Sequence, residues 1–280
     1  MNPTGWKPPA SPRRPASTRK RGEQVEAGPT DIDGVSFDEI HELFANSSYG
    51  KILRQRVRYG PYKPKELSDE EWIRILGPDV NNLEHLKTSL AVAQDFIHRA
   101  RDPHPEWQSK GEEIRFTPGE EKLLCLTAVI HDWGEAVVGD ILWHRKTEKD
   151  GEKELEILKG LIEELVRYKF TDSLVDKMHL AADIAFGKNE KLSPAFNAIE
   201  HIGYGNNTLR MWGEKLNYDG LLSKTLTGLA KQLTTHHYPT WQEYAGTYPA
   251  SHYWLSRHKK IFQEIKAADI NWEDPILVNN

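Results

Sequence analysis

A ten-residue run in the middle of the chain places imidazole and carboxylate groups directly after an apolar segment. The run is His131-Asp132-Trp133-Gly134-Glu135-Ala136-Val137-Val138-Gly139-Asp140. In the preceding segment, residues 123–130, every side chain is apolar except that of Thr127, which predicts a buried helix. Burying a histidine and an ionised aspartate without partners is unfavourable. A divalent cation removes this difficulty, because imidazole and carboxylate groups are ligands for such ions. We therefore expect a metal-dependent catalytic site at this run.

The run resembles the signature of the HD-domain metal-dependent phosphohydrolases, and within them the branch that contains the 5′-deoxynucleotidases. That branch carries a His-Asp pair, then a Glu three residues after the Asp, then a Gly-Asp pair; here these positions are Asp132, Glu135, Gly139 and Asp140. The resemblance implies hydrolysis of a phosphate ester, with a deoxyribonucleoside 5′-monophosphate as the expected substrate. It implies that Glu135 positions water or transfers a proton, and that Asp140 orients the sugar or the leaving oxygen.

The remaining metal ligands are expected on other helices. The resemblance implies a histidine at the start of the preceding helix, and His85 follows Glu84 at the head of an apolar helix. It also implies a later carboxylate followed by a lysine, with a helical Glu ten residues on. Glu190 fits that spacing to Glu200, whereas Asp183, within an apolar segment, is its rival. The expected ligands are thus His85, His131, Asp132 and Glu190 or Asp183. The ion is Mn, Co, Zn, Fe or Mg, because the ligand types do not separate these.

Basic side chains soon after Asp140 are candidates for binding the substrate phosphate. His144 and Arg145 are cationic donors, and such donors beside a metal suit a phosphate dianion. The resemblance also implies that a lysine of the segment 146–156 lies near the phosphate, without selecting one of its lysines. We expect His144 and Arg145 to contact substrate.

A pair of adjacent histidines, His236 and His237, lies in an aromatic stretch with Tyr238, Trp241 and Tyr244. Neighbouring residues project to different sides of a helix, so the pair is a poor metal site. These side chains line a substrate pocket or pack in an aromatic core. The second interpretation is favoured, because aromatic residues dominate core contacts.

The elements that must position these residues are helices. Apolar residues recur at three- and four-residue steps between Leu83 and Ile97, as on one face of a helix. The next helix should begin with the capping box of Thr117 and Glu120, with Pro118 at its first position. Further helices are expected at about 152–168, 172–186, 194–212, 220–234 and 252–268. No strand pattern of useful length is visible. The predicted fold is therefore all-α, and the resemblance implies an HD-type helical bundle.

Composition divides the 280 residues into three parts. Residues 1–30 are rich in Pro and Arg and are expected to form a disordered basic tail. The resemblance implies that residues 35–214 form the phosphohydrolase domain, and residues 215–280 are expected to form a C-terminal helical extension packed on it. Residues 1–26 hold six basic and two acidic residues, which leaves −9 for the rest of a chain whose net charge is −5. A basic tail of this kind can attract nucleic acid or phosphate, or it can be a targeting segment. The favoured interpretation is a solvated extension without such a role.

Composition also restricts the class of protein. There is no apolar run long enough to span a membrane and no secretory leader, so a cytoplasmic protein is expected. Cys125 is the single cysteine, which excludes an intramolecular disulfide. The expected partner is a small phosphorylated molecule such as a nucleotide. A homodimer is one possible assembly, and binding of nucleic acid is expected, if anywhere, at the basic tail.

Two other functions remain open at this stage. Some HD-domain proteins are di-iron oxygenases with a His-Asp-x-Gly-Lys run, but Glu135 stands where that lysine would be. A non-catalytic HD scaffold that binds nucleic acid or a protein is the other alternative. The presence of both Glu135 and Asp140 argues against it.

Overall fold

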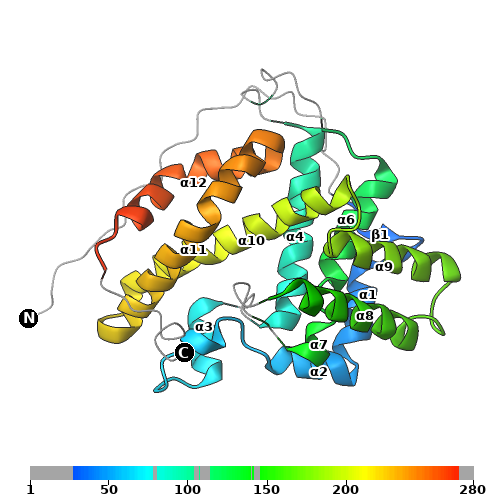
Figure 1. Cartoon of the computed structure of the whole chain (residues 1–280), viewed down its shortest axis with the longest axis horizontal. Coiled ribbons are helices and arrows are strands. Elements are labelled where there is room, and N and C mark those ends of the chain that lie inside the picture. The colour runs from blue at the N-terminus through cyan, green and yellow to red at the C-terminus, as the bar shows by residue number, and fades with distance from the viewer. Residues whose placement is uncertain are drawn as a thin grey trace, which may run out of the picture.

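The computed structural model describes residues 28–77, 81–103, 107, 114–139, 141 and 146–270, and nearly all regular structure in them is helical (Figure 1). The all-α prediction is confirmed. The exception within these ranges is a two-residue antiparallel hairpin of β1 (Asp31–Ile32) and β2 (Val35–Ser36). Asp33 and Gly34 join its strands with φ of 52° and 78°. Both positive angles suit an Asp-Gly hairpin turn. Apart from residues 28–30, the predicted tail lies outside the described residues.

Three short helices and one 3₁₀ turn precede the helix that carries His85. They are α1 (Phe37–Ala45), α2 (Ser48–Gln55), η1 (Gly60–Tyr62) and α3 (Asp69–Leu76). A serine caps the N-terminus of each α-helix, since Ser36, Ser47 and Ser68 each accept a hydrogen bond from a backbone N–H of the first turn. The segment between α2 and α3, which carries Arg58, therefore runs into a capped helix start at Ser68.

Two packed helices bring the predicted histidines toward each other. They are α4 (Asn82–Arg101) and α6 (Pro118–Ile130). The capping box is confirmed, because the Thr117 hydroxyl accepts from the Glu120 N–H and the Glu120 carboxylate accepts from the Thr117 N–H. His85 lies in the first turn of α4, and His131 is the C-cap residue of α6. The start of one helix and the end of the other thus frame the site.

Four further helices follow along the chain. They are α7 (Glu135–Val138), α8 (Glu148–Leu165), α9 (Asp172–Ala185) and α10 (Leu192–Glu214). α10 packs against α4, α6 and α9, and α8 packs against α9. Gly134, in the turn before α7, lies so close to α8 that a Cβ there would come within 3.0 Å of the Glu154 carbonyl oxygen. Glycine at this position therefore lets the His-Asp turn rest directly on α8.

The C-terminal segment forms a 3₁₀ turn and two long helices against the rest of the fold. They are η3 (Lys215–Asn217), α11 (Gly220–Thr247) and α12 (Pro249–Ala267). α11 lies along α10, and α12 lies along both α11 and α4 (Figure 1). α12 approaches α10 closely because Gly205 has no side chain, since a Cβ there would meet the Trp254 ring at 2.0 Å. α11 extends well beyond the predicted 220–234 and continues through Pro239. In the part of the chain that the structure describes, no helix is long and apolar enough to cross a membrane.

Candidate metal centre

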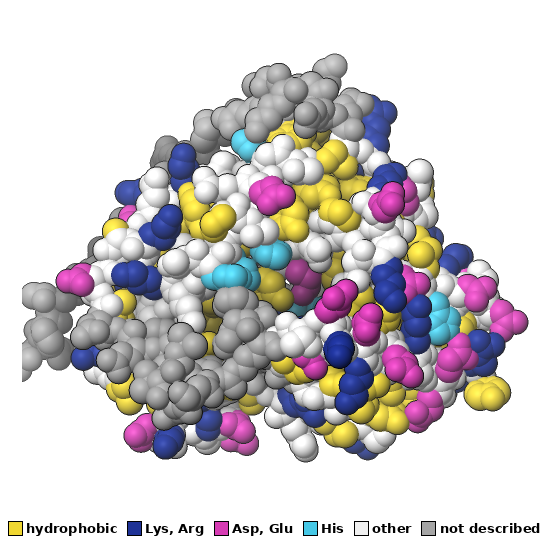
Figure 2. Space-filling model, viewed as in Figure 1, with side chains coloured by type: hydrophobic (Ala, Val, Ile, Leu, Met, Phe, Trp, Pro, Cys, Tyr) yellow, Lys and Arg dark blue, Asp and Glu magenta, His cyan; other side chains and the backbone are white. Residues whose placement is uncertain are grey.

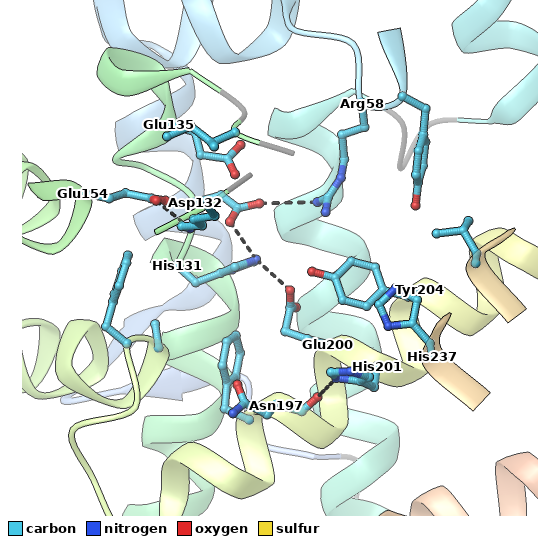
Figure 3. A pocket seen from close by; sticks show the side chains of 17 residues that line it. Arg58, His131, Asp132, Glu135, Glu154, Asn197, Glu200, His201, Tyr204 and His237 are labelled. Atoms are coloured by element: carbon cyan, nitrogen blue, oxygen red, sulfur yellow. Dashed lines mark hydrogen bonds and ion pairs between the residues drawn. The ribbon is translucent and has the colours of Figure 1, made fainter. Parts of the chain in front are cut away.

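Two imidazoles and two carboxylates from α4, α10 and the end of α6 surround one buried point. Figure 3 shows three of these side chains, His131, Asp132 and Glu200. His85, His131 and Glu200 each offer one ligand atom, and these atoms lie within 4.8 Å of one another. His131 Nε2 lies 3.4 Å from Glu200 Oε2 and 3.3 Å from Asp132 Oδ1. His85 Nε2 lies 3.9 Å from Asp132 Oδ2 and 4.0 Å from Glu200 Oε2. The predicted ligands His85, His131 and Asp132 are therefore brought together, and Glu200 joins them.

Backbone and hydroxyl contacts orient the two imidazoles. His131 Nδ1 donates to the Ala128 carbonyl at 3.0 Å, which directs Nε2 toward the carboxylates. That buried Nε2 makes no hydrogen bond of normal geometry within the described residues. His85 Nε2 lies 3.3 Å from the Ser89 hydroxyl, which donates to Glu200 Oε1 at 3.2 Å. A ring nitrogen held by a carbonyl while the other faces anionic oxygens is the usual arrangement of a metal-ligating histidine.

The charges of this group favour a cation at its centre. Burial disfavours ionisation of Asp132 and Glu200, but the His131 ring outweighs it and lowers the pKa of both carboxyls. Burial likewise opposes protonation of His131, yet the same two carboxylates raise its pKa above the ordinary value. Burial lowers the pKa of His85 to about 3, so this ring is neutral. Two anionic groups thus hold a proton on His131, which is what a bound divalent cation would displace.

Arg58 contributes a positive charge that the sequence did not reveal. Its Nη1 lies 3.4 Å from Asp132 Oδ2, and its side chain is only 12% exposed. Burial alone would lower the pKa of Arg58, but the negative charge of Asp132 outweighs it and raises the pKa. Nothing in the local sequence separates Arg58 from Arg54 and Arg56, which share its charged stretch.

Glu135, the predicted proton-transfer residue, begins α7 and faces the same pocket. The fully buried Asn82 donates from Nδ2 to Glu135 Oε2 at 2.5 Å. Asn82 is the first residue of α4, the helix that carries His85. One helix end therefore fixes both a candidate ligand and the carboxylate beside it.

A pocket with a volume of about 280 Å³ opens beside the metal group. Figure 2 shows a hollow near the centre of one face, with histidine side chains on its rim and an acidic side chain inside. The charged part of its lining includes Lys146, which pairs with the buried Glu154 at 2.6 Å. Burial raises the pKa of Glu154, whereas Glu154 raises that of Lys146. A lysine of the predicted segment 146–156 therefore does line the pocket.

The two carboxylates proposed for the last ligand position lie elsewhere. Glu190 is exposed in the turn before α10, and Asp183 pairs with Lys159 at 2.7 Å. Neither lines the pocket. Glu200 is the carboxylate that joins the histidines, because it stands on the buried face of α10, four residues after Phe196. An acid within an apolar helical stripe was the signal that could have found it. Asp140, His144 and Arg145 lie outside the described residues.

Comparisons of the chain with family models, with curated proteins and with solved structures found no match. The function is therefore inferred from the site itself.

Proposed function

We propose that this protein is a metal-dependent phosphohydrolase that cleaves a phosphate ester. The observation that carries the proposal is the buried group of two imidazoles and two carboxylates beside a pocket that also presents Arg58 and Lys146. The resemblance of residues 131–140 to the HD-domain phosphohydrolases supports it and directs the substrate toward deoxyribonucleoside 5′-monophosphates. Acidic and basic groups that line the same pocket suit a substrate that is held through both a metal and its phosphate oxygens.

The residues present fit a divalent cation. The donor set combines the nitrogen and oxygen ligands that such ions take, and His131 Nε2 is buried without a hydrogen bond of normal geometry within the described ranges. His85, His131, Asp132 and Glu200 would hold the ion. When bound, a divalent cation supplies Lewis acidity that polarises a phosphate ester and favours ionisation of water.

The chain's own side chains account for the remaining tasks. Arg58 and Lys146 bind phosphate oxygens, and both are kept cationic by nearby carboxylates. Asp132 holds Arg58 and Glu154 holds Lys146, so both cationic side chains are in position before the substrate binds. Glu135 is oriented by Asn82 and accepts the proton of the attacking water.

The test combines metal analysis of the purified chain with a screen for phosphate release. The screen covers nucleoside mono-, di- and triphosphates, each with Mn²⁺, Co²⁺, Zn²⁺, Fe²⁺ and Mg²⁺. We expect phosphate release from deoxyribonucleoside 5′-monophosphates that chelation abolishes and added metal restores. The Asp132→Ala variant should lose both bound metal and turnover, whereas the control Asp183→Asn should keep both. Turnover that survives chelation, or a normal rate in Asp132→Ala, would contradict the proposal.

A further inference from the structure

One side of the pocket is built from rings. His201 and Tyr204 reach it from α10, and His237 and Leu233 from α11. The rings of Tyr204 and His237 are stacked, with centroids 4.9 Å apart and an interplanar angle of 17°. The His201 ring meets both edge-on, at 5.6 Å from Tyr204 and 5.2 Å from His237. We call His201, Tyr204 and His237 the ring wall (Figure 3).

The ring wall carries no charge that would select a phosphate. Burial lowers the pKa of His237 to about 3, so its imidazole is neutral near pH 7. Leu233, one turn before His237 on α11, adds apolar surface to the same side of the pocket, whereas the Phe196 ring packs against His131 at 5.3 Å. Arg58 marks the boundary with the charged side, since its guanidinium lies 6.0 Å from the Tyr204 ring centroid. A ligand bound here therefore has one planar or apolar end and one anionic end.

Polar groups in the ring wall favour a heterocycle over a plain hydrocarbon ring. His201 Nδ1 donates to the backbone carbonyl of Asn197 at 2.8 Å. In the neutral ring the other nitrogen, Nε2, is therefore a hydrogen-bond acceptor. The exposed Asn197 carboxamide, which also lines the pocket, offers a donor and an acceptor. Flat π-systems with polar edges, such as nucleobases, satisfy both kinds of contact, because aromatic side chains stack on any base.

We propose that His201, Tyr204 and His237 form a subsite for the nucleobase of a nucleotide whose phosphate lies at Arg58 and Lys146. The proposal rests on the proposed phosphohydrolase function for the phosphate end only. His237 belongs to α11, in the C-terminal segment that lies beyond the phosphohydrolase domain expected from the sequence. The extension therefore takes part in substrate selection, and its packing along α10 places His237 against Tyr204.

The subsite is tested by binding of ligands that contain only one half of a nucleotide. Thymidine and deoxyadenosine carry the base without phosphate, and ribose 5-phosphate carries the phosphate without a base. Calorimetric titration uses the full-length chain loaded with metal. We expect both nucleosides to bind. Tyr204→Leu and His237→Leu should weaken nucleoside binding roughly tenfold to hundredfold, the effect of removing one stacked aromatic group. Affinity for ribose 5-phosphate should not change in either variant.

His236→Leu is the matched control. It replaces a histidine on the same helix that is exposed and does not line the pocket, although its ring lies 4.6 Å from that of His237. Nucleoside binding should match that of the unaltered chain. Melting temperatures confirm that each variant is folded, and Tyr204→Leu retains the test if His237→Leu unfolds.

The outcomes separate this inference from the proposed function. One outcome is that the two variants weaken nucleoside binding although the protein releases no phosphate from any nucleotide. That outcome would support the subsite and contradict the proposed phosphohydrolase function. Phosphate release with no nucleoside binding to the unaltered chain would overturn the subsite alone. Equal losses of nucleoside and ribose 5-phosphate affinity in Tyr204→Leu would also overturn it.

Discussion

Two groups of histidines lie on two sides of one pocket, and their chemistry differs because their neighbours differ. His85 and His131 lie beside the carboxylates of Asp132 and Glu200. The ring wall histidines lie beside other rings. The carboxylates raise the pKa of His131, whereas burial lowers the pKa of His237 to about 3. The first group therefore attracts a cation, whereas the second is uncharged and has no carboxylate among these ring contacts to hold one.

The hydrogen bond to the backbone does not distinguish the two groups. His131 donates to the carbonyl of Ala128, and His201 donates to the carbonyl of Asn197, at 3.0 and 2.8 Å. Both rings therefore have a fixed orientation and one remaining nitrogen. What that nitrogen faces determines its use, and two carboxylate oxygens face only that of His131. Carboxylates, rather than histidines, therefore mark the candidate metal side of this pocket.

The largest expected effect follows from removing one of these carboxylates. Glu200→Gln nearly preserves the side-chain shape but removes the negative charge that a divalent cation favours. We expect metal affinity to fall by at least roughly two orders of magnitude, since even outer-shell changes cost about 10–100-fold. Hydrolysis should fall with it. Elemental analysis and metal titration measure the loss.

Glu190→Gln provides the control, because Glu190 is exposed in the turn before α10. Its metal affinity should equal that of the unaltered chain. If Glu190→Gln weakens metal binding more than Glu200→Gln does, the arrangement of the metal centre described above is wrong.

The next effect concerns turnover without metal loss. Glu135 is held by Asn82 rather than by the histidines, so Glu135→Ala should retain metal and substrate. Turnover should fall by about two to four orders of magnitude, the usual contribution of a general acid–base group. Phosphate-release rates, measured with bound metal checked in the same sample, test this. A variant with near-normal kcat would remove Glu135 from the mechanism.

Much of the metal centre was predictable because its residues are local to one pattern. His131 and Asp132 directly follow a buried helix. The resemblance of residues 131–140 implied a further histidine at the head of the preceding helix, and helix periodicity located that helix and so His85. The same reasoning predicted the all-α fold and the capping box at Thr117 and Glu120. These features depend on neighbours within about one or two helical turns. Interactions between residues that are close in the chain can therefore be predicted from the sequence.

The residues that sequence reasoning missed depend on packing between distant segments. Arg58 meets Asp132 across 74 positions, and Glu200 meets Ser89 across 111. Glu190 was preferred over Asp183 for its spacing to Glu200 and its following lysine, and Glu200 itself, on the buried face of α10, was not considered as a ligand. The ring wall required α11 to continue past residue 234, which carries His237 to Tyr204. No local pattern encodes which helix faces pack together.

A smaller effect is expected from pH, and it distinguishes the two imidazole ligands. The raised pKa of His131 means that a proton must leave before a cation binds. Apparent metal affinity should therefore rise with pH, by up to about tenfold per unit below the His131 pKa, and level off above it. His85, with a pKa of about 3, adds no dependence above about pH 4. Calorimetry in two buffers of different ionisation enthalpy counts the released protons.

Release of close to one proton per ion near neutral pH is the expected result. A value near zero would mean that His131 is already neutral without metal. The Glu200→Gln variant sharpens the measurement, because loss of one carboxylate should lower the pKa of His131 and reduce the proton count.

The smallest effect is expected at Ser89, whose hydroxyl touches two candidate ligands at once. It lies 3.3 Å from His85 Nε2 and donates to Glu200 Oε1 at 3.2 Å. Ser89→Ala removes this link without removing a ligand, so metal affinity should fall only about tenfold, at the lower end for outer-shell partners. Thr88→Ala is the control, because its hydroxyl donates to the Glu84 carbonyl one turn back instead. Ser89→Ala should also leave nucleoside binding at the ring wall unchanged, since that wall contains no metal ligand. A Ser89→Ala variant with unaltered metal affinity would show that His85 and Glu200 are oriented by their own helices alone.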